Sequence, residues 1–211
     1  NPRWRQGVTG WERSFATWLR TPEPDAVLAS GIFFDMRALV GDTALLERVR
    51  GPVLELAPQQ TAFLTHLARH AVRHGPPLGF FRGFVLEREG EHASTLNLKQ
   101  RGITPVVDLA RVHALAVGTP ALGTHARLRA VAAAGRVGAG TAADLSDALE
   151  VIASVRLRHQ GRQVRDGAEP DNHVDPQELG SLDRRHLRDA FAVVKAAQGV
   201  LARSYPLHYL S

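Results

Sequence analysis

Apolar residues recur along this chain with the period of an α-helix. Trp11, Phe15, Trp18 and Leu19 stand at i, i+4, i+7 and i+8, which places them on one helical face. Glycine and proline interrupt the pattern, and both residues end helices. Helices are therefore predicted over residues 11–19, 25–40, 42–51, 58–74, 105–116, 125–134, from 141 to a polar loop at 166–176, and 182–205. The sequence thus predicts an all-α fold, a multi-helix bundle.

One stretch, residues 80–98, departs from the helical period. Runs of β-forming residues at 83–86 and 95–98 flank the turn-forming Glu89, Gly90 and Glu91. Two interpretations fit: a short β-hairpin around residues 82–98, or irregular chain that lies over the helices. No repeat, low-complexity tract or linker divides the sequence. We therefore expect residues 1–211 to form a single helical domain.

Composition limits the classes of function. Cysteine is absent, which excludes disulfides, thiolate catalysis and cysteine-ligated zinc. No apolar run reaches the roughly 18–20 residues that span a bilayer, so we expect a cytoplasmic protein without a membrane segment. The net charge of +5 would suit nucleic acid, but acidic residues are interspersed throughout and nearly all the basic residues are arginine. A mixed, solvated surface is the preferred interpretation, and nucleic acid is not an expected partner.

Motifs of autonomous catalysis are absent from the sequence. It lacks a triphosphate-binding Gly-Ser loop with a following Asp-x-Asp, a Walker loop, a G-x-S-x-G elbow and H-E-x-x-H. His66, His70 and His74 stand at i, i+4 and i+8 and could bind a transition metal. Arg69 and Arg73 lie nearby, however, and would repel a cation. We expect no metal site and no catalysis by this chain alone.

Charged residues continue an apolar stripe near residue 156. The stripe at positions 145, 149 and 152 leads onto Arg156 and His159. A charge in such a place is costly unless it is paired or faces a cavity. Arg156 therefore either contacts a ligand in a cleft or forms a helix-locking ion pair with a buried carboxylate, of Asp35 or Asp108. On another face, Arg158 begins an arginine series at i, i+4 and i+7 that could clamp phosphate or carboxylate.

Other charged side chains stand out against their surroundings. Asp35 and Arg37 follow an apolar run at 32–34. Lys99 is one of only two lysines in a chain that otherwise uses arginine, which hints at a specific need for lysine there. Asp108 and Arg111 lie one helical turn apart and are expected to form an i, i+3 ion pair.

Seven strings in a fixed order resemble one known family. They are NPRWR at 1–5 with Trp11 and Trp18 after it, IFFDMR at 32–37, PPLGFFR at 76–82, TLNLKQRG at 95–102, VDLAR at 107–111, RLRHQ at 156–160 and PDNHVDP at 170–176. Together they resemble the nucleotidyltransferase substrate-binding domain of bacterial signalling proteins that also carry cyclic-nucleotide-binding and CBS domains. The resemblance runs from residue 1 to about residue 198. A more distant similarity, to the PII uridylyltransferase of nitrogen sensing, rests on Asp35, Arg37, Gly41, Asp42, Lys99 and Asp108.

This resemblance implies a longer parent protein. Residues 1–20 would continue from an upstream nucleotidyltransferase domain that holds Mg²⁺ and a nucleoside triphosphate, whereas this fragment holds no cofactor. The present domain would bind the acceptor, a protein or a small molecule, and help to close the active site. The implied site residues are the cationic Arg37, Lys99, Arg101, Arg156 and Arg158, together with Asp35, Asp108, His159, Asp171 and Asn172.

Two departures from the family pattern leave the role of the Lys99 loop open. Asn97 stands where an Asp is expected, and His113 stands where a Tyr is expected. Two other classes of function also stay open. One is a regulatory protein-interaction module without transferase activity, whose apolar surface would meet a partner or form a homodimer. The other is nucleic-acid binding through residues 158–165, which would weaken steeply with salt.

Overall fold

A computed structural model describes residues 4–22, 31, 33–79 and 83–207. The α-helices of this part are α1 (Val8–Arg20), α3 (Thr43–Leu56), α4 (Thr61–Arg73), α5 (Thr104–Ala116), α6 (Thr124–Ala133), α7 (Ala139–Arg165) and α8 (Ser181–Ser204). Short 3-10 turns lie at Ala57–Gln59 and Pro176–Glu178, and a π turn lies at Lys99–Ile103. Two strands, β1 (Leu96–Asn97) and β2 (His173–Val174), pair with each other. The predicted all-α class is confirmed.

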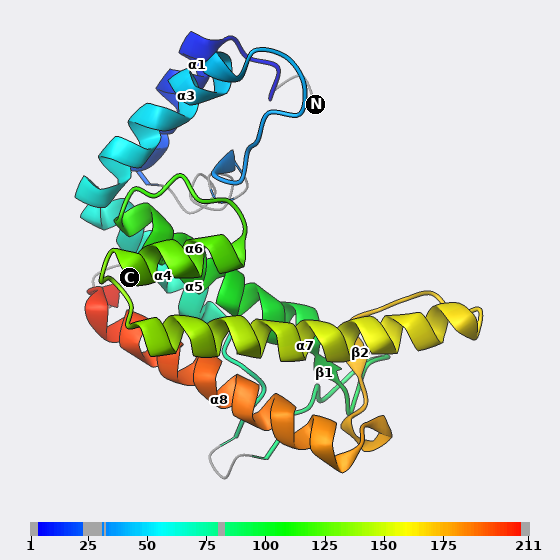
Figure 1. Ribbon diagram of the computed structural model, residues 1–211. Helices are drawn as coiled ribbons and strands as arrows, with labels where there is room; N and C mark the ends of the chain where they lie inside the picture. Colours follow the sequence, from blue (N-terminus) through cyan, green and yellow to red (C-terminus); the bar gives the residue numbers. More distant parts are fainter. Residues whose placement is uncertain (1–3, 23–30, 32, 80–82, 208–211) are drawn as a thin grey trace.

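The helices bury one continuous hydrophobic core. Its largest fully buried side chains include Phe63 of α4, Leu109 of α5, Ile152 of α7 and Phe191 of α8. Each such side chain contributes about 1.5–3 kcal/mol when it leaves water, so packing of the helices holds the bundle together. α7 and α8 lie side by side, whereas α1 and α3 pack together at one end of the molecule (Figure 1). No helix in the described ranges is both long and apolar enough to cross a membrane.

The helix predicted over residues 42–51 is longer than its sequence pattern indicated. Asp42 caps it as expected, since its carboxylate accepts a hydrogen bond from the backbone N–H of Ala44 at 2.9 Å. Its predicted end at Gly51 and Pro52 is wrong, because α3 continues through Pro52 to Leu56. Val49 and Val53 are both buried, one on each side of the proline, and their packing holds the helix across it.

The helix predicted over residues 25–40 is wrong in its second half. Residues 25–30 and 32 lie outside the described part of the chain. Phe34 and Asp35 form a turn, closed by a hydrogen bond from Met36 N–H to the Phe33 carbonyl at 3.2 Å, and no helix follows up to residue 40. Leu39 and Val40 are 81% and 96% exposed, so no packing stabilises a helical conformation there.

The stretch from 83 to 98 contributes one of the two strands. β1 pairs antiparallel with β2, with Leu96 opposite Val174 and Asn97 opposite His173. Before it, the chain closes on itself, because Glu87 accepts a backbone hydrogen bond from Ser94 and donates one to Thr95. The polar loop predicted at 166–176 therefore supplies a strand to a segment far away in the sequence.

Candidate functional site

The π turn at Lys99–Ile103 leads from β1 into α5. Its ring is one residue wider than that of an α-helix, with Thr104 N–H bonded to the Lys99 carbonyl. Asn97 stabilises the start of the turn, since its side-chain oxygen accepts a hydrogen bond from Gln100 N–H at 2.9 Å. Turns of this kind are rare and occur often at functional sites. This one places the side chain of Lys99 at the mouth of a cleft.

Gly102 lets the π turn pack tightly against the core. A Cβ atom there would lie 2.8 Å from Cγ2 of Ile152 and 3.4 Å from Cε1 of Phe191. Both neighbours are fully buried and cannot swing into solvent.

We expect Gly102→Ala to lower the free energy of unfolding by about 2 kcal/mol, the usual cost of overpacking a core. Urea denaturation would measure it. Gly161→Ala is the matched control, because Gly161 lies within α7 with open space around its Cα. That control should be stabilised slightly, since alanine favours a helix over glycine by about 1 kcal/mol. Equal stability of Gly102→Ala and the parent would contradict the packing described.

Asn172 joins the π turn to α7. Its backbone carbonyl accepts a hydrogen bond from Leu98 N–H at 2.9 Å, directly before Lys99. Its side-chain oxygen accepts a hydrogen bond from Nε of Arg156 at 2.6 Å. One residue therefore links the Arg156 guanidinium to the backbone directly before Lys99, although the two residues are 57 positions apart in the sequence.

Asp171 holds this junction in place. Its Oδ1 accepts a hydrogen bond from His173 N–H at 2.9 Å and lies 3.0 Å from Nε2 of the buried His159. Burial by itself would raise the pKa of Asp171, but hydrogen bonds from His173, His159 and Gln163 outweigh it and lower the pKa. His159 and Asp171 thus support Asn172 from behind and do not line the cleft.

The cleft has a volume of about 410 Å³ and lies between α4, the π turn, α5 and α7. Leu67, Ile103, Val107 and Val112 contribute its apolar walls. The polar lining residues are His70, Lys99, Thr104, Asp108, Arg111 and Arg156. The cleft is therefore mainly apolar, with cationic groups among its lining residues.

Among the residues that the structure describes, the two cations that line the cleft have no carboxylate partner. Within the described part of the chain, the Lys99 ammonium has no hydrogen-bond or ion-pair partner. The Arg156 guanidinium is bonded to the neutral amide of Asn172. Of the two alternatives for Arg156, the ion pair with Asp35 or Asp108 is wrong, because Arg111 of α5 and Arg127 of α6 bind these carboxylates.

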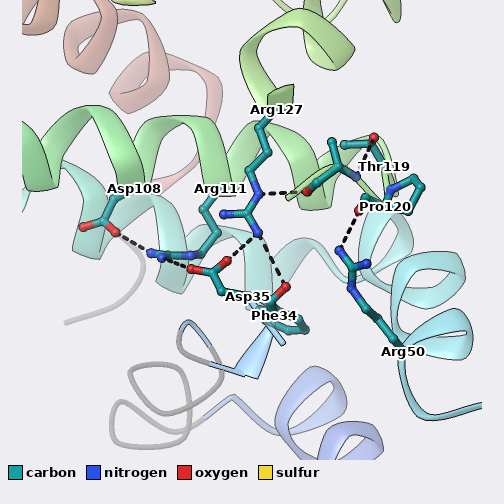
Figure 2. A network of polar contacts seen from close by, with 9 residues as sticks. Phe34, Asp35, Arg50, Asp108, Arg111, Thr119, Pro120 and Arg127 are labelled. Atoms are coloured by element: carbon teal, nitrogen blue, oxygen red, sulfur yellow. Dashed lines mark hydrogen bonds and ion pairs between the residues drawn. The ribbon is translucent and has the colours of Figure 1, made fainter. Parts of the chain in front are cut away.

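Those arginines form the network shown in Figure 2. Arg111 donates to Asp108 at 2.6 Å, as the i, i+3 spacing predicts, and to Asp35 at 2.8 Å. The nearly buried Arg127 binds the other oxygen of Asp35 and the Ala121 carbonyl. Nearby, Arg50 of α3 donates to the Pro120 carbonyl at 2.8 Å. The network connects the turn at Asp35, α5 and α6.

The two carboxylates of the network differ in their electrostatics. Burial by itself would raise the pKa of Asp35, but hydrogen bonds and charge from Arg111 and Arg127 outweigh it and lower the pKa. For Asp108 burial prevails, and it raises the pKa although Arg111 and His70 oppose it. Nε2 of His70 lies 3.8 Å from Oδ2 of Asp108. Both carboxylates carry a matching guanidinium, so the network is close to neutral.

Of the ten predicted site residues, only Lys99, Asp108 and Arg156 are among the described residues that line the cleft, and three of the others lie elsewhere. Arg37 is exposed in the segment before α3. Arg101 donates to the Gly75 carbonyl at 3.2 Å and lies 3.9 Å from Glu87. Arg158 points to α8 and pairs with Asp183 at 2.8 Å. The arginine face that begins at Arg158 is thus partly neutralised by acidic residues.

Sequence reasoning missed two polar residues of this region. The histidine spacing marks His70 only as a metal ligand that the nearby arginines disfavour, yet His70 lines the cleft beside Asp108. No group of three metal-binding side chains gathers in the described part of the chain. Arg127 gave no signal at all, because Arg129 follows it in the same helix and only the fold separates the buried arginine from the exposed one.

Comparison with known proteins assigns the chain to a family. A family model described as "putative nucleotidyltransferase substrate binding domain" matches residues 61–205. No curated protein and no solved structure matches the chain. The matched region extends from the start of α4 to the end of α8 and includes the cleft with Lys99, Asn172 and Arg156. The chain therefore belongs to this family of nucleotidyltransferase substrate-binding domains.

Proposed function

We propose that this domain binds the acceptor substrate of an associated nucleotidyltransferase domain in the cleft between Lys99 and Arg156, and helps to close the active site over it. The observation that carries the proposal is a pair of cations, Lys99 and Arg156, that have no carboxylate partner among the described residues and that both line one apolar cleft. The catalytic domain would precede residues 1–20, in a bacterial signalling protein with cyclic-nucleotide-binding and CBS domains.

The chemistry would be divided between the two domains. Nucleotidyl transfer depends mainly on positioning and on charge stabilisation by Mg²⁺ held between carboxylates and the triphosphate. This cleft does not suit Mg²⁺, because Lys99 and Arg156 repel a cation and Asp108, the one carboxylate among its described lining residues, is bonded to Arg111. In this proposal the catalytic domain would hold Mg²⁺ and the nucleotide, and the present domain would contribute recognition of the acceptor.

A transfer assay tests the proposal. The protein that carries this chain together with its nucleotidyltransferase domain would be incubated with labelled ATP, GTP, CTP or UTP, Mg²⁺ and a cell extract as the source of acceptor. We expect Lys99→Ala and Arg156→Ala each to reduce label transfer at least about tenfold, since each removes a charge-assisted contact of about 1.5–3 kcal/mol. Arg158→Ala is the matched control, because Arg158 lies on the same helix but outside the cleft.

Thermal unfolding of each variant would separate recognition from folding. Lys99 is exposed and Arg156 half-buried, so both variants should keep the melting temperature of the parent within a few degrees. Unchanged transfer in both variants would refute the proposal. Absence of transfer with every nucleotide in the unsubstituted protein would favour a regulatory interaction module instead.

A further inference from the structure

We propose that the group recognised in this cleft is a doubly charged phosphate monoester attached to a compact apolar body. This inference rests on the proposed function, because it names the chemistry of the acceptor that the same cleft would hold. It follows from the balance of charge, the edge of Arg156 that is left open, and the apolar walls.

Among the described residues, the balance of charge around the cleft leaves two positive charges. Arg111 and Arg127 are matched by Asp35 and Asp108, which removes four charged groups from the count. Lys99 and Arg156 remain, and within the described residues neither has a carboxylate partner. Two cations at a cleft with a low-dielectric wall favour an anion of charge −2 over one of charge −1.

Arg156 presents one open edge of its guanidinium. Its Nε is engaged by Asn172, so this bond fixes the plane of the group. Its two Nη atoms form no protein hydrogen bond in the described part of the chain and can bind two oxygens of one phosphate side by side. Lys99 would add a compact point charge, and Thr104 in the cleft lining can donate a hydroxyl hydrogen bond. This donor set fits a phosphate group with several acceptor oxygens.

The apolar walls of the cleft indicate what kind of group would be attached to the phosphate. Leu67, Ile103, Val107 and Val112 line the interior and offer no hydrogen bond from their side chains. The volume of about 410 Å³ suits a small molecule or one side chain better than a folded surface. An apolar body beside the phosphate would therefore add affinity, at about 25 cal/mol for each Å² that it removes from water.

Phenyl phosphate is the probe that combines both features. The 211-residue chain would be titrated calorimetrically at about pH 8, where a phosphate monoester carries two charges because its second pKa is near 6. Inorganic phosphate lacks the apolar body, and benzyl alcohol lacks the charge. We expect phenyl phosphate to bind at least about tenfold more tightly than inorganic phosphate or benzyl alcohol, because each of these lacks either the apolar contact or the charge.

Substitutions of the two cations would show whether phenyl phosphate binds in the cleft. Lys99→Gln and Arg156→Gln should each weaken the binding of phenyl phosphate at least about tenfold, whereas Lys99→Arg should weaken it less than Lys99→Gln because the charge remains. Arg158→Gln should bind like the parent. Circular dichroism of each variant would confirm that it is folded.

Three results would overturn the inference: no binding of phenyl phosphate at millimolar concentration, equal binding of benzyl alcohol, or binding that neither Lys99→Gln nor Arg156→Gln weakens. These results are distinct from a failure of the proposed function. If Lys99→Ala and Arg156→Ala impair nucleotidyl transfer while phenyl phosphate does not bind, the acceptor role stands and the phosphate inference fails. If phenyl phosphate binds but neither substitution affects nucleotidyl transfer, the cleft is a phosphate site and the acceptor role fails.

Discussion

Acidification from pH 7 to pH 4 should cost this protein about 3 kcal/mol of unfolding free energy through His113 alone. Burial, with the charge of Arg136 in support, lowers the pKa of His113 to about 4 from its ordinary 6.5. The residue is 9% exposed, and its Nδ1 is buried without a hydrogen-bond partner in the described structure. A proton on Nδ1 would therefore find no acceptor among the described residues.

The folded and unfolded states bind this proton at different pH values, and that difference makes the protein less stable in acid. Below pH 6.5 the unfolded chain protonates His113, whereas the folded chain resists protonation until about pH 4. Stability is thus fully present above pH 6.5, falls as the pH drops towards 4, and levels off below it. A pKa difference of 2.5 corresponds to about 3 kcal/mol, at about 1.4 kcal/mol for each unit.

Chemical denaturation at both pH values, on the parent and on His113→Leu, would test this prediction. Leucine fills similar space and takes up no proton, so the variant should lose about 3 kcal/mol less than the parent on acidification. The comparison cancels the titration of carboxylates that both proteins share. His186→Leu, at an exposed position of α8, should retain the pH dependence of the parent. Identical pH dependence of His113→Leu and the parent would show that His113 is not the buried neutral group described.

Arg127→Ala should lower the free energy of unfolding by about 3 kcal/mol, the lower end of the range for breaking a buried ion pair. The Arg127 side chain is 5% exposed and binds Asp35 and the carbonyl of Ala121. Its loss would leave that carbonyl unsatisfied and one oxygen of Asp35 unpaired. The loss stays at the lower end because Asp35 is partly exposed and keeps Arg111 as a partner.

Urea denaturation of Arg127→Ala beside Arg129→Ala would measure the effect. Arg129 lies two residues further along α6 and is exposed, so its removal should change stability by no more than about 0.5 kcal/mol. Similar losses in the two variants would mean that Arg127 acts only through helix propensity. Because Asp35 lies in the N-terminal segment, limited proteolysis should also cut Arg127→Ala near residue 35 faster than the parent.

Helical periodicity predicted most of the fold because a helix is a local structure. The apolar stripe of α1 and the buried positions of α4, α5, α7 and α8 repeat within a few turns, so each helix is visible by itself. The errors lie where distant packing decided the outcome. α3 passes through Pro52 because Val53 is buried, and residues 36–40 are not helical although their sequence permits a helix.

Single residues and local pairs of the candidate site could be predicted from the sequence, but the contacts between its distant segments could not. The i, i+3 pair of Asp108 and Arg111 follows from helical geometry, and the break in an apolar stripe correctly marked Arg156 as a residue in need of a partner or a cavity. Its partner, Asn172, lies across a loop, and Asp35 meets Arg127 from 92 positions away. No local pattern records such contacts, because they exist only after the helices have packed.

The π turn makes the length of this segment as important as its composition. An α-helix turns by about 100° for each residue, so a turn with one extra residue shifts everything before it by that angle relative to α5. A deletion of one residue within Lys99–Ile103 would let the turn relax into an α-helix and rotate Lys99 around the helix axis. β1 is held by its pairing with β2, and Leu98 by Asn172, so the chain could not follow that rotation without losing one of these contacts. Relatives of this domain should therefore tolerate exchanges of side chains in the turn more readily than a change in its number of residues.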